Sequence, residues 1–159
     1  MVSMKIFMRV EGLPGSSMEV GREDWSDIRG FEHALEYPFD MRDNKGRGEP
    51  EHGACCVIKE MDKASPKFYE ALAKKKKVDE VVLEFERDTP DSGATEVYFR
   101  ISLTDCRVIS ARPHTPSLEG NNHLPPHAEQ IGFAYRHIKW EWLSGGALET
   151  VYDFADPNS

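Results

Sequence analysis

The segment MDKASPKFYEAL at residues 61–72 predicts one short helix, which begins at Ser65 and runs to about Lys77. Ser65 is expected to be the N-cap, because its hydroxyl can accept a hydrogen bond from a free N–H of the first turn. Pro66 suits the first helical position, where its missing N–H costs nothing. Strand patterns flank this helix on both sides, so the sequence predicts a packed or closed sheet with one helix against it. This order argues against a parallel α/β enzyme.

The predicted helix has an apolar face and a basic end. Phe68 and Leu72 lie four residues apart and so share one face of the helix. The four lysines at 74–77 lie where the helix dipole favours cations. A formal net charge of −8 disfavours nucleic acid or an anionic membrane as the main partner. The lysine run is therefore interpreted as a solvated helix end, and neither nucleic-acid binding nor membrane insertion is predicted.

Alternating apolar residues predict antiparallel strands through most of the remaining chain. In the second strand, Phe31, Leu35, Tyr37, Phe39 and Met41 are expected to share one face of a long, half-buried strand. The apolar phase reverses near Asp105 and again near Arg136, which predicts bulges or bends and strong curvature, as in a small barrel. The predicted strands cover residues 4–10, 31–41, 52–61, 78–87, 96–109, 131–142 and 148–154.

The fold class predicted from these patterns is mainly β: a small closed antiparallel β-barrel with one flanking α-helix. A single domain is expected over residues 1–159. Its core spans about residues 4–143, and an extra C-terminal strand spans about 147–155.

A polar segment between the second and third strands is expected to project as a mobile loop, because it has no apolar side chain to anchor it. It carries both charge signs and two glycines, which makes it the candidate contact surface of the chain. Its proposed contact residues are Arg42, Asp43, Asn44, Lys45, Arg47, Glu49 and Glu51.

No catalytic, cofactor or metal site is predicted. His114, His123 and His127 occur in one loop, but Pro125 and Pro126 exclude the helix that would bring two of them to one face. The acidic residues are interpreted as solvated strand faces. Trp25, Trp140 and Trp142 could stack on a ligand, although core packing is the favoured interpretation of the latter two.

Cysteine use and the N-terminal sequence indicate where the chain folds. Three cysteines without framework spacing predict reduced thiols and folding in the cytoplasm. Lys5 and Arg9 interrupt the first apolar run, so no signal-peptide core is expected. Export would then use a route that does not require a signal peptide.

The order of these motifs resembles the haemolysin-coregulated protein (Hcp) family, the tube subunit of the bacterial type VI secretion system. The resemblance covers roughly residues 4–143 and rests chiefly on Asp62-Lys63-Ala64-Ser65-Pro66-Lys67, supported by the strand with Ile138, Trp140 and Trp142. The loop at 112–127 and the tail after Leu143 depart from the family pattern.

The resemblance implies hexameric rings that stack into a hollow, secreted tube, with effector proteins carried in its lumen. Its partners would be further copies of the chain, the spike protein, the sheath and effectors. The chain would be cytoplasmic before firing and then reach the extracellular space or a target cell. The 42–51 loop is assigned to ring-to-ring contact. Two alternatives remain open: a monomeric β-barrel binding module or chaperone for one partner, and an enzyme with an unrecognised site.

Overall fold

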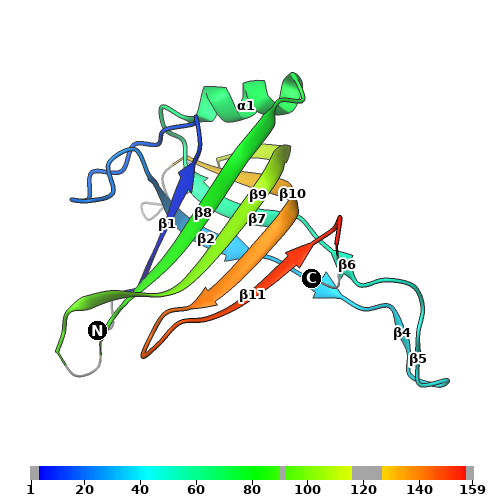
Figure 1. The fold of residues 1–159 in the computed structure, drawn as a ribbon. Coiled ribbons are helices and arrows are strands. Elements are labelled where there is room, and N and C mark those ends of the chain that lie inside the picture. Colours follow the sequence, from blue (N-terminus) through cyan, green and yellow to red (C-terminus); the bar gives the residue numbers. More distant parts are fainter. Residues whose placement is uncertain (1–3, 90–91, 116–126, 157–159) are drawn as a thin grey trace, which may run out of the picture.

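The computed structural model describes residues 4–89, 92–115 and 127–156, and most of them lie in strands. Helix α1 is the single helix in these residues (Figure 1). The elements are β1 (Met4–Val10), β2 (Ser26–Glu32), β3 (Leu35–Glu36), β4 (Phe39–Asp40), β5 (Lys45–Gly46), β6 (Glu51–His52), β7 (Cys55–Glu60), α1 (Ser65–Ala73), β8 (Lys77–Asp88), β9 (Thr95–His114), β10 (Ala128–Trp142) and β11 (Leu148–Asp153).

Six antiparallel strands close into a barrel in the order β10-β7-β2-β1-β8-β9, and β9 pairs back with β10. The first part of β10 pairs with β7, whereas its last part, His137–Trp142, pairs with β11. The C-terminal strand therefore extends the sheet of its own chain. The predicted fold class, a closed antiparallel barrel with one helix, is confirmed.

The two predicted phase reversals lie opposite each other on neighbouring strands. Asp105 of β9 has a left-handed backbone with a φ of 57°. Arg136 of β10 faces it, between the pairs Tyr135–Cys106 and His137–Thr104. The extra residue of the bulge is Ile109, because Gly132 pairs with Ser110 and Phe133 with Val108. The buried phase reverses between Leu103 and Cys106 and between Phe133 and Ile138, as predicted, but the register shift lies at Gly132/Phe133 and not at either predicted position.

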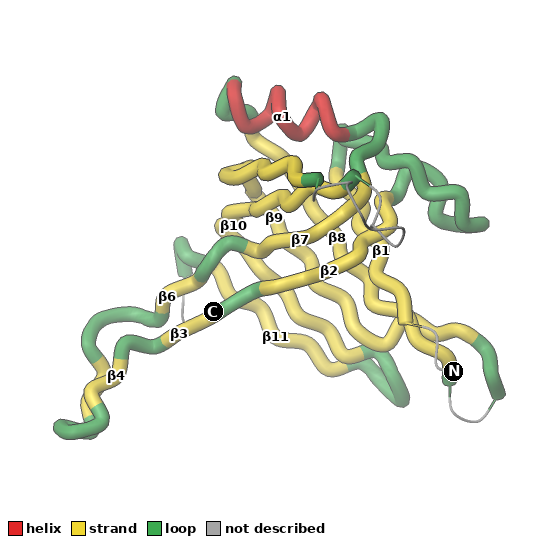
Figure 2. The backbone as a smooth tube through the Cα atoms, turned by 180° about the vertical axis from the view of Figure 1, so that it is seen from behind, coloured by secondary structure: helices red, strands yellow, loops and turns green. Residues whose placement is uncertain are grey.

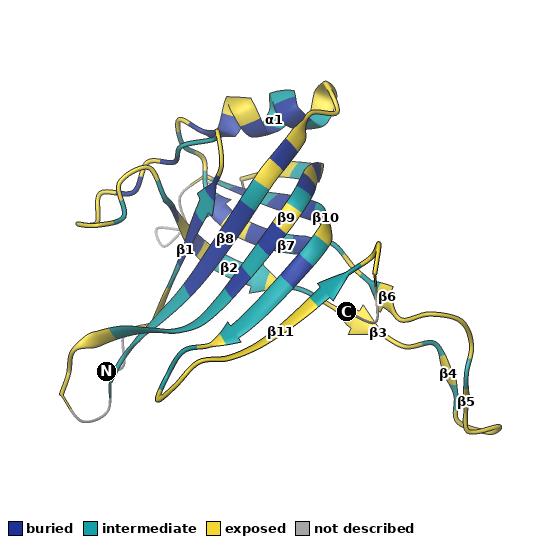
Figure 3. Ribbon diagram, viewed as in Figure 1, coloured by how far each residue is buried: buried dark blue, intermediate teal, exposed yellow. Residues whose placement is uncertain are grey.

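Apolar side chains from all six barrel strands fill the interior, and α1 covers one end (Figures 1 and 3). Phe68 of α1 is fully buried, with its ring centroid 6.1 Å from that of Phe133. Burying such a side chain contributes about 1.5–3 kcal/mol. The helix therefore belongs to the core of the barrel.

The helix begins at Ser65, as predicted, but the predicted N-cap and the predicted C-terminal end are wrong. Ala64 is the N-cap and makes no side-chain capping bond. The Ser65 hydroxyl instead accepts from the Asp62 N–H at 2.9 Å, outside the helix. The helix ends at Ala73, because Lys75 adopts a φ of 55° and turns the chain toward β8. Lys77 thus begins a strand and does not end the helix.

The predicted long second strand is also wrong. It stops at Glu32, and the chain leaves the barrel as a narrow arm, residues 33–52, in which β3 pairs with β6 and β4 with β5 (Figure 2). Within the described residues, no further barrel strand covers the arm. Of the apolar side chains expected on a half-buried face, Phe31 packs on the core, whereas the four on the arm are exposed.

Candidate functional site

The arm carries a row of exposed apolar side chains. Leu35, Tyr37, Phe39 and Met41 are 47%, 54%, 48% and 88% exposed. The Tyr37 and Phe39 rings lie edge to face, 6.1 Å apart. Tyr37 lies directly over Gly46, where a Cβ would come within 1.7 Å of its hydroxyl. A contiguous apolar row on a projecting element is typical of an interaction surface.

The predicted contact segment 42–51 forms the tip of this arm and its return toward the barrel. It projects as predicted, but β5 makes it a hydrogen-bonded hairpin and not an irregular loop. An Arg47 nitrogen lies 2.8 Å from the Asp40 carboxylate and 3.1 Å from that of Asp43. The Arg47 hydrogen bond, helped by the Arg42 N–H, holds the pKa of Asp40 below its usual value. These bonds stabilise the shape of the tip.

Where the arm leaves the barrel, three polar side chains meet. The Tyr135 hydroxyl of β10 lies 2.6 Å from His52 Nδ1 and 2.9 Å from His33 Nε2. The His52 ring stacks on Tyr152 with a centroid distance of 4.6 Å, and Phe154 packs against it at 4.8 Å. The two histidines are 19 positions apart in the sequence, so no spacing rule indicates that they share a partner.

A buried ion-pair cluster lies behind the Asp62–Lys67 motif. The Lys59 ammonium, fully buried, lies 2.6 Å from a carboxylate oxygen of the equally buried Glu129 and 2.9 Å from Asp62. The hydroxyls of Ser65 and Tyr69 donate to Glu129. Burial and the Glu129 hydrogen bond raise the pKa of Tyr69 to about 12. The motif therefore joins the helix to β7 and β10.

Sequence reasoning missed this cluster, although a signal was present. Lys59 continues the buried phase of Cys55 and Val57 on β7, and Glu129 begins the buried phase of β10. Two opposite charges in buried phases of paired strands indicate a buried ion pair. No motif search for catalytic residues would select them.

A second charged group lies on the outside of the barrel. Glu84 of β8 pairs with Arg22 and with Arg100, the latter at 2.7 Å, and Arg22 also lies over the Trp25 ring at 4.5 Å. Burial acts to raise the pKa of Glu84, but the two guanidinium groups outweigh it and leave that pKa below its usual value. Trp25 thus packs on an arginine of its own chain.

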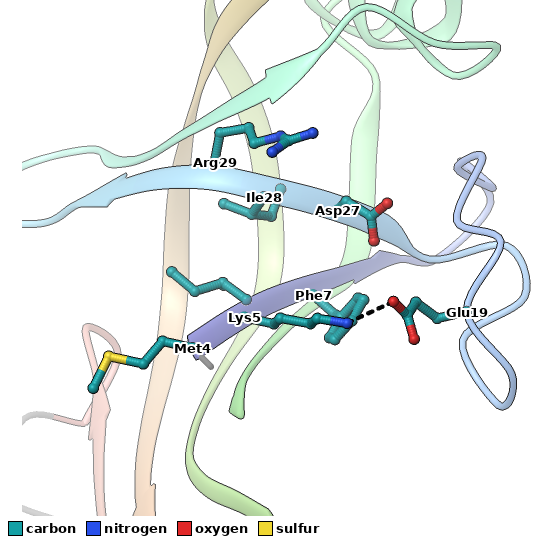
Figure 4. Close-up of a pocket in the computed structure, with 8 residues that line it drawn as sticks. Met4, Lys5, Phe7, Glu19, Asp27, Ile28 and Arg29 are labelled. Atoms are coloured by element: carbon teal, nitrogen blue, oxygen red, sulfur yellow. Dashed lines mark hydrogen bonds and ion pairs between the residues drawn. The ribbon is translucent and has the colours of Figure 1, made fainter. Parts of the chain in front are cut away.

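A groove lies where β1 and β2 diverge (Figure 4). The two strands pair only from Ile6 to Met8 on β1. Lys5 crosses the groove to pair with Glu19 at 2.7 Å, as Figure 4 shows. The groove has a volume of about 370 Å³ and is lined by Met4, Lys5, Ile6, Phe7, Glu19, Asp27, Ile28 and Arg29.

The remaining candidates are partly outside the described residues. His123 and the prolines at 125–126 fall there, while His114 and His127 lie at the described ends of that loop. Within the described ranges, no cluster of three or more His, Cys, Asp or Glu side chains is suited to a metal. Trp140 packs on the core, whereas Trp142 is 38% exposed beside Tyr98. No described helix is long and apolar enough to cross a membrane.

These features define a class: a small closed β-barrel with one capping helix and a projecting β-hairpin with an apolar face. The sequence profile of the family described as "Type VI secretion system effector, Hcp" matches residues 7–142. The chain belongs to this Hcp family, as the resemblance predicted.

Known proteins agree with this assignment. The "Major exported protein" of Pseudomonas aeruginosa is 29% identical over 128 residues, covering 79% of this chain and 73% of that protein. A mutant Hcp1 from the E. coli EAEC 042 pathovar has a TM-score of 0.79 at 23% identity, covering 95% of this chain and 97% of its own. Hcp1 of Salmonella typhimurium has a TM-score of 0.78 at 17% identity and covers 98% of both chains. The two structures show that the fold is shared.

Proposed function

We propose that this chain, acting as one domain, is a tube subunit of a type VI secretion system. It forms hexameric rings that stack into a hollow tube, and it is exported with that tube. Family membership supports the secretion system as the setting. The exposed apolar row of the arm is the observation that carries the proposal of assembly.

The arm is stabilised within the chain but its apolar side chains are not covered by it. Fully burying a side chain of this kind contributes about 1.5–3 kcal/mol, and Met41 alone is 88% exposed. A second copy of the chain that covers this row would gain that contribution at each residue. An apolar row beyond the barrel therefore favours repeated contacts between copies over a monomeric binding module.

Ring and stack use different surfaces in this proposal. A closed ring needs two unlike patches on each chain, joined head to tail. The arm carries Arg42, Asp43 and Lys45 at its tip and Glu49 on its return toward β6, with both charge signs on one hairpin. We assign this tip and the apolar row to contacts between rings, where charges of opposite sign fix the register.

The partners and location follow from the same proposal. The chain is cytoplasmic before firing, and it contacts the sheath on the outside of the tube, the spike at its tip and effectors in its lumen. Release into the medium should then depend on a functional sheath. Release that is equal with and without the sheath would contradict the proposed export route.

The arm assignment is tested with a matched pair of variants. Met41→Ser and Met18→Ser each remove one exposed methionine, 88% and 94% exposed, the first on the arm and the second away from it. We expect both proteins to form rings of wild-type mass by sedimentation. Only Met41→Ser should shorten tubes in negative-stain images and reduce secretion.

Two outcomes would refute parts of the proposal. Equal loss of tubes in both variants would show that the arm has no special role. A wild-type chain that sediments as a monomer at all concentrations would refute the tube subunit and favour the binding module. Monomers formed only by Met41→Ser would instead assign the arm to the ring itself.

A further inference from the structure

The chain passes between the barrel and the arm twice, and each passage carries a histidine that contacts the same hydroxyl group. His33 lies just before β3 on the outgoing passage, and His52 ends β6 on the return. Both reach Tyr135, which belongs to the barrel strand β10. The Gly53 N–H donates to the Ala34 carbonyl at 2.9 Å and joins the two passages beside this cluster. One tyrosine thus fixes both ends of the arm.

Several further groups surround this root cluster, which we define as His33, His52 and Tyr135. Burial raises the pKa of Tyr135, and the nearby thiol of Cys55 on β7 and the hydroxyl of Tyr152 on β11 act in the same direction. Phe154 closes the cluster toward the C-terminus, with its ring 5.9 Å from that of Tyr135. The end of β11 therefore lies beside β6, as Figure 1 shows.

The nearest carboxylate on β11 is already paired with other groups. Asp153, adjacent to Tyr152, lies 3.0 Å from His137 Nε2 and 3.8 Å from Arg136. Successive side chains of a strand point to opposite faces. Asp153 is therefore directed away from the root cluster and does not neutralise its histidines.

We propose that the root cluster is a pH-sensitive hinge: protonation of His33 and His52 releases the arm from the barrel wall. The root cluster determines how stably the arm is attached to the barrel. It lies apart from the tip that we assign to contact between rings.

Hydrogen-bond counting gives the mechanism. A tyrosine hydroxyl has one proton to donate and two lone pairs to accept with, whereas a neutral imidazole has one donor and one acceptor nitrogen. With neutral rings, Tyr135 donates to one histidine and accepts from the other. When both rings are protonated, both nitrogens are donors, and the hydroxyl proton loses its acceptor. Two positive charges then lie within about 6 Å of each other around one oxygen, which is unfavourable where water is partly excluded.

The direction of the pH effect follows from the two histidines. Burial, and then the neighbouring His52, lower the pKa of His33 below its ordinary value of 6.5. Burial also lowers the pKa of His52. The closed root is therefore fully stable above about pH 6.5 and loses stability as the pH falls from there through the lowered pKa values. Two contacts act in the opposite direction, the stacking of Tyr152 on His52 and a hydrogen bond of His33 with the Gly53 backbone, but burial outweighs both and the two pKa values stay lowered.

The consequence for assembly rests on the proposed function. If the arm joins rings, tubes should separate into rings in mild acid while the rings persist. The hinge itself is tested on the chain without reference to tubes, so the two proposals can fail separately.

The experiment measures hydrogen–deuterium exchange of peptides covering 33–53 at pH 7.5 and pH 5.5, corrected for the intrinsic exchange rate. We expect protection of the arm root to fall about tenfold at the lower pH, with β8 unchanged. His33→Gln with His52→Asn places a neutral amide near each contacting ring nitrogen, and this variant should keep its protection at both pH values. His114→Gln, an exposed histidine away from the root, is the matched control and should behave as wild type.

Two results would overturn the hinge. One is unchanged protection of the wild-type root between the two pH values; the other is an equal loss in the double variant. If the double variant does not fold, Tyr135→Phe gives a second test. It removes the shared hydroxyl, so the root should be weakly protected at both pH values and no longer respond to pH. A Tyr135→Phe protein with the full wild-type response would also refute the hinge.

Discussion

Replacing Lys59 by methionine removes the ammonium that faces Glu129 inside the barrel. Both side chains are fully buried, and their charged atoms are 2.6 Å apart. Removing one partner of a buried ion pair costs about 3–5 kcal/mol, because the remaining charge stays out of water without compensation. The Ser65 and Tyr69 hydroxyls still donate to Glu129, which reduces the free-energy cost of leaving its charge unpaired. We therefore expect the free energy of unfolding to fall by about 3 kcal/mol, the lower end of that range.

The second half of the experiment is the double variant. Lys59→Met with Glu129→Leu leaves no buried charge between β7 and β10, so it should cost less than Lys59→Met alone plus Glu129→Leu alone. Urea unfolding at one fixed protein concentration measures each free energy. A Lys59→Met protein within about 1 kcal/mol of wild type would refute the reasoning. So would a double variant whose cost equals the sum of the single variants.

The remaining predictions concern charge and thiols. Each chain carries −8, so ring assembly should strengthen when salt rises from low to physiological concentration, and light scattering that shows rings dissociating would contradict this. Burial raises the pKa of Cys55 and of Cys106 to about 12. A thiol reagent at pH 8 should therefore label at most Cys56, which is only partly buried, until the chain unfolds. Because Arg22 and Arg100 hold the pKa of Glu84 below its usual value, their contribution is present above about pH 4.5 and is lost as the pH falls through the lowered pKa. Glu84→Gln should lose about 1–3 kcal/mol at pH 7 and show a smaller loss in acid, by thermal unfolding.

Much of the barrel could be predicted because its signals are local. The strand β1 lies at residues 4–10, as the alternation predicted, and the buried phases of β9 and β10 reverse near Asp105 and Arg136, as predicted. The long second strand could not be corrected from sequence. Alternation at 31–41 shows that one face is apolar, but it does not show whether that face meets this barrel or another molecule.

The candidate site divides in the same way. The polar residues at 42–51 predict a projecting segment, and the structure places them on the arm. The apolar row beside them was interpreted as a buried strand face, because apolar side chains are most often covered by their own chain. The root cluster was not predicted at all. His33, His52 and Tyr135 come from three distant parts of the chain.

The sequence by itself determined the class of fold, the family and the position of the helix, since these depend on periodicity and on one ordered motif. Tertiary structure alone decided what each polar group of that motif does. Serine is a residue type typical of N-caps, yet the Ser65 hydroxyl donates to Glu129, 64 residues away. The pairing of β7 with β10 places this buried carboxylate within its reach. A group follows its local preference only until a stronger long-range partner is brought within reach, and the sequence does not show which strands will become neighbours.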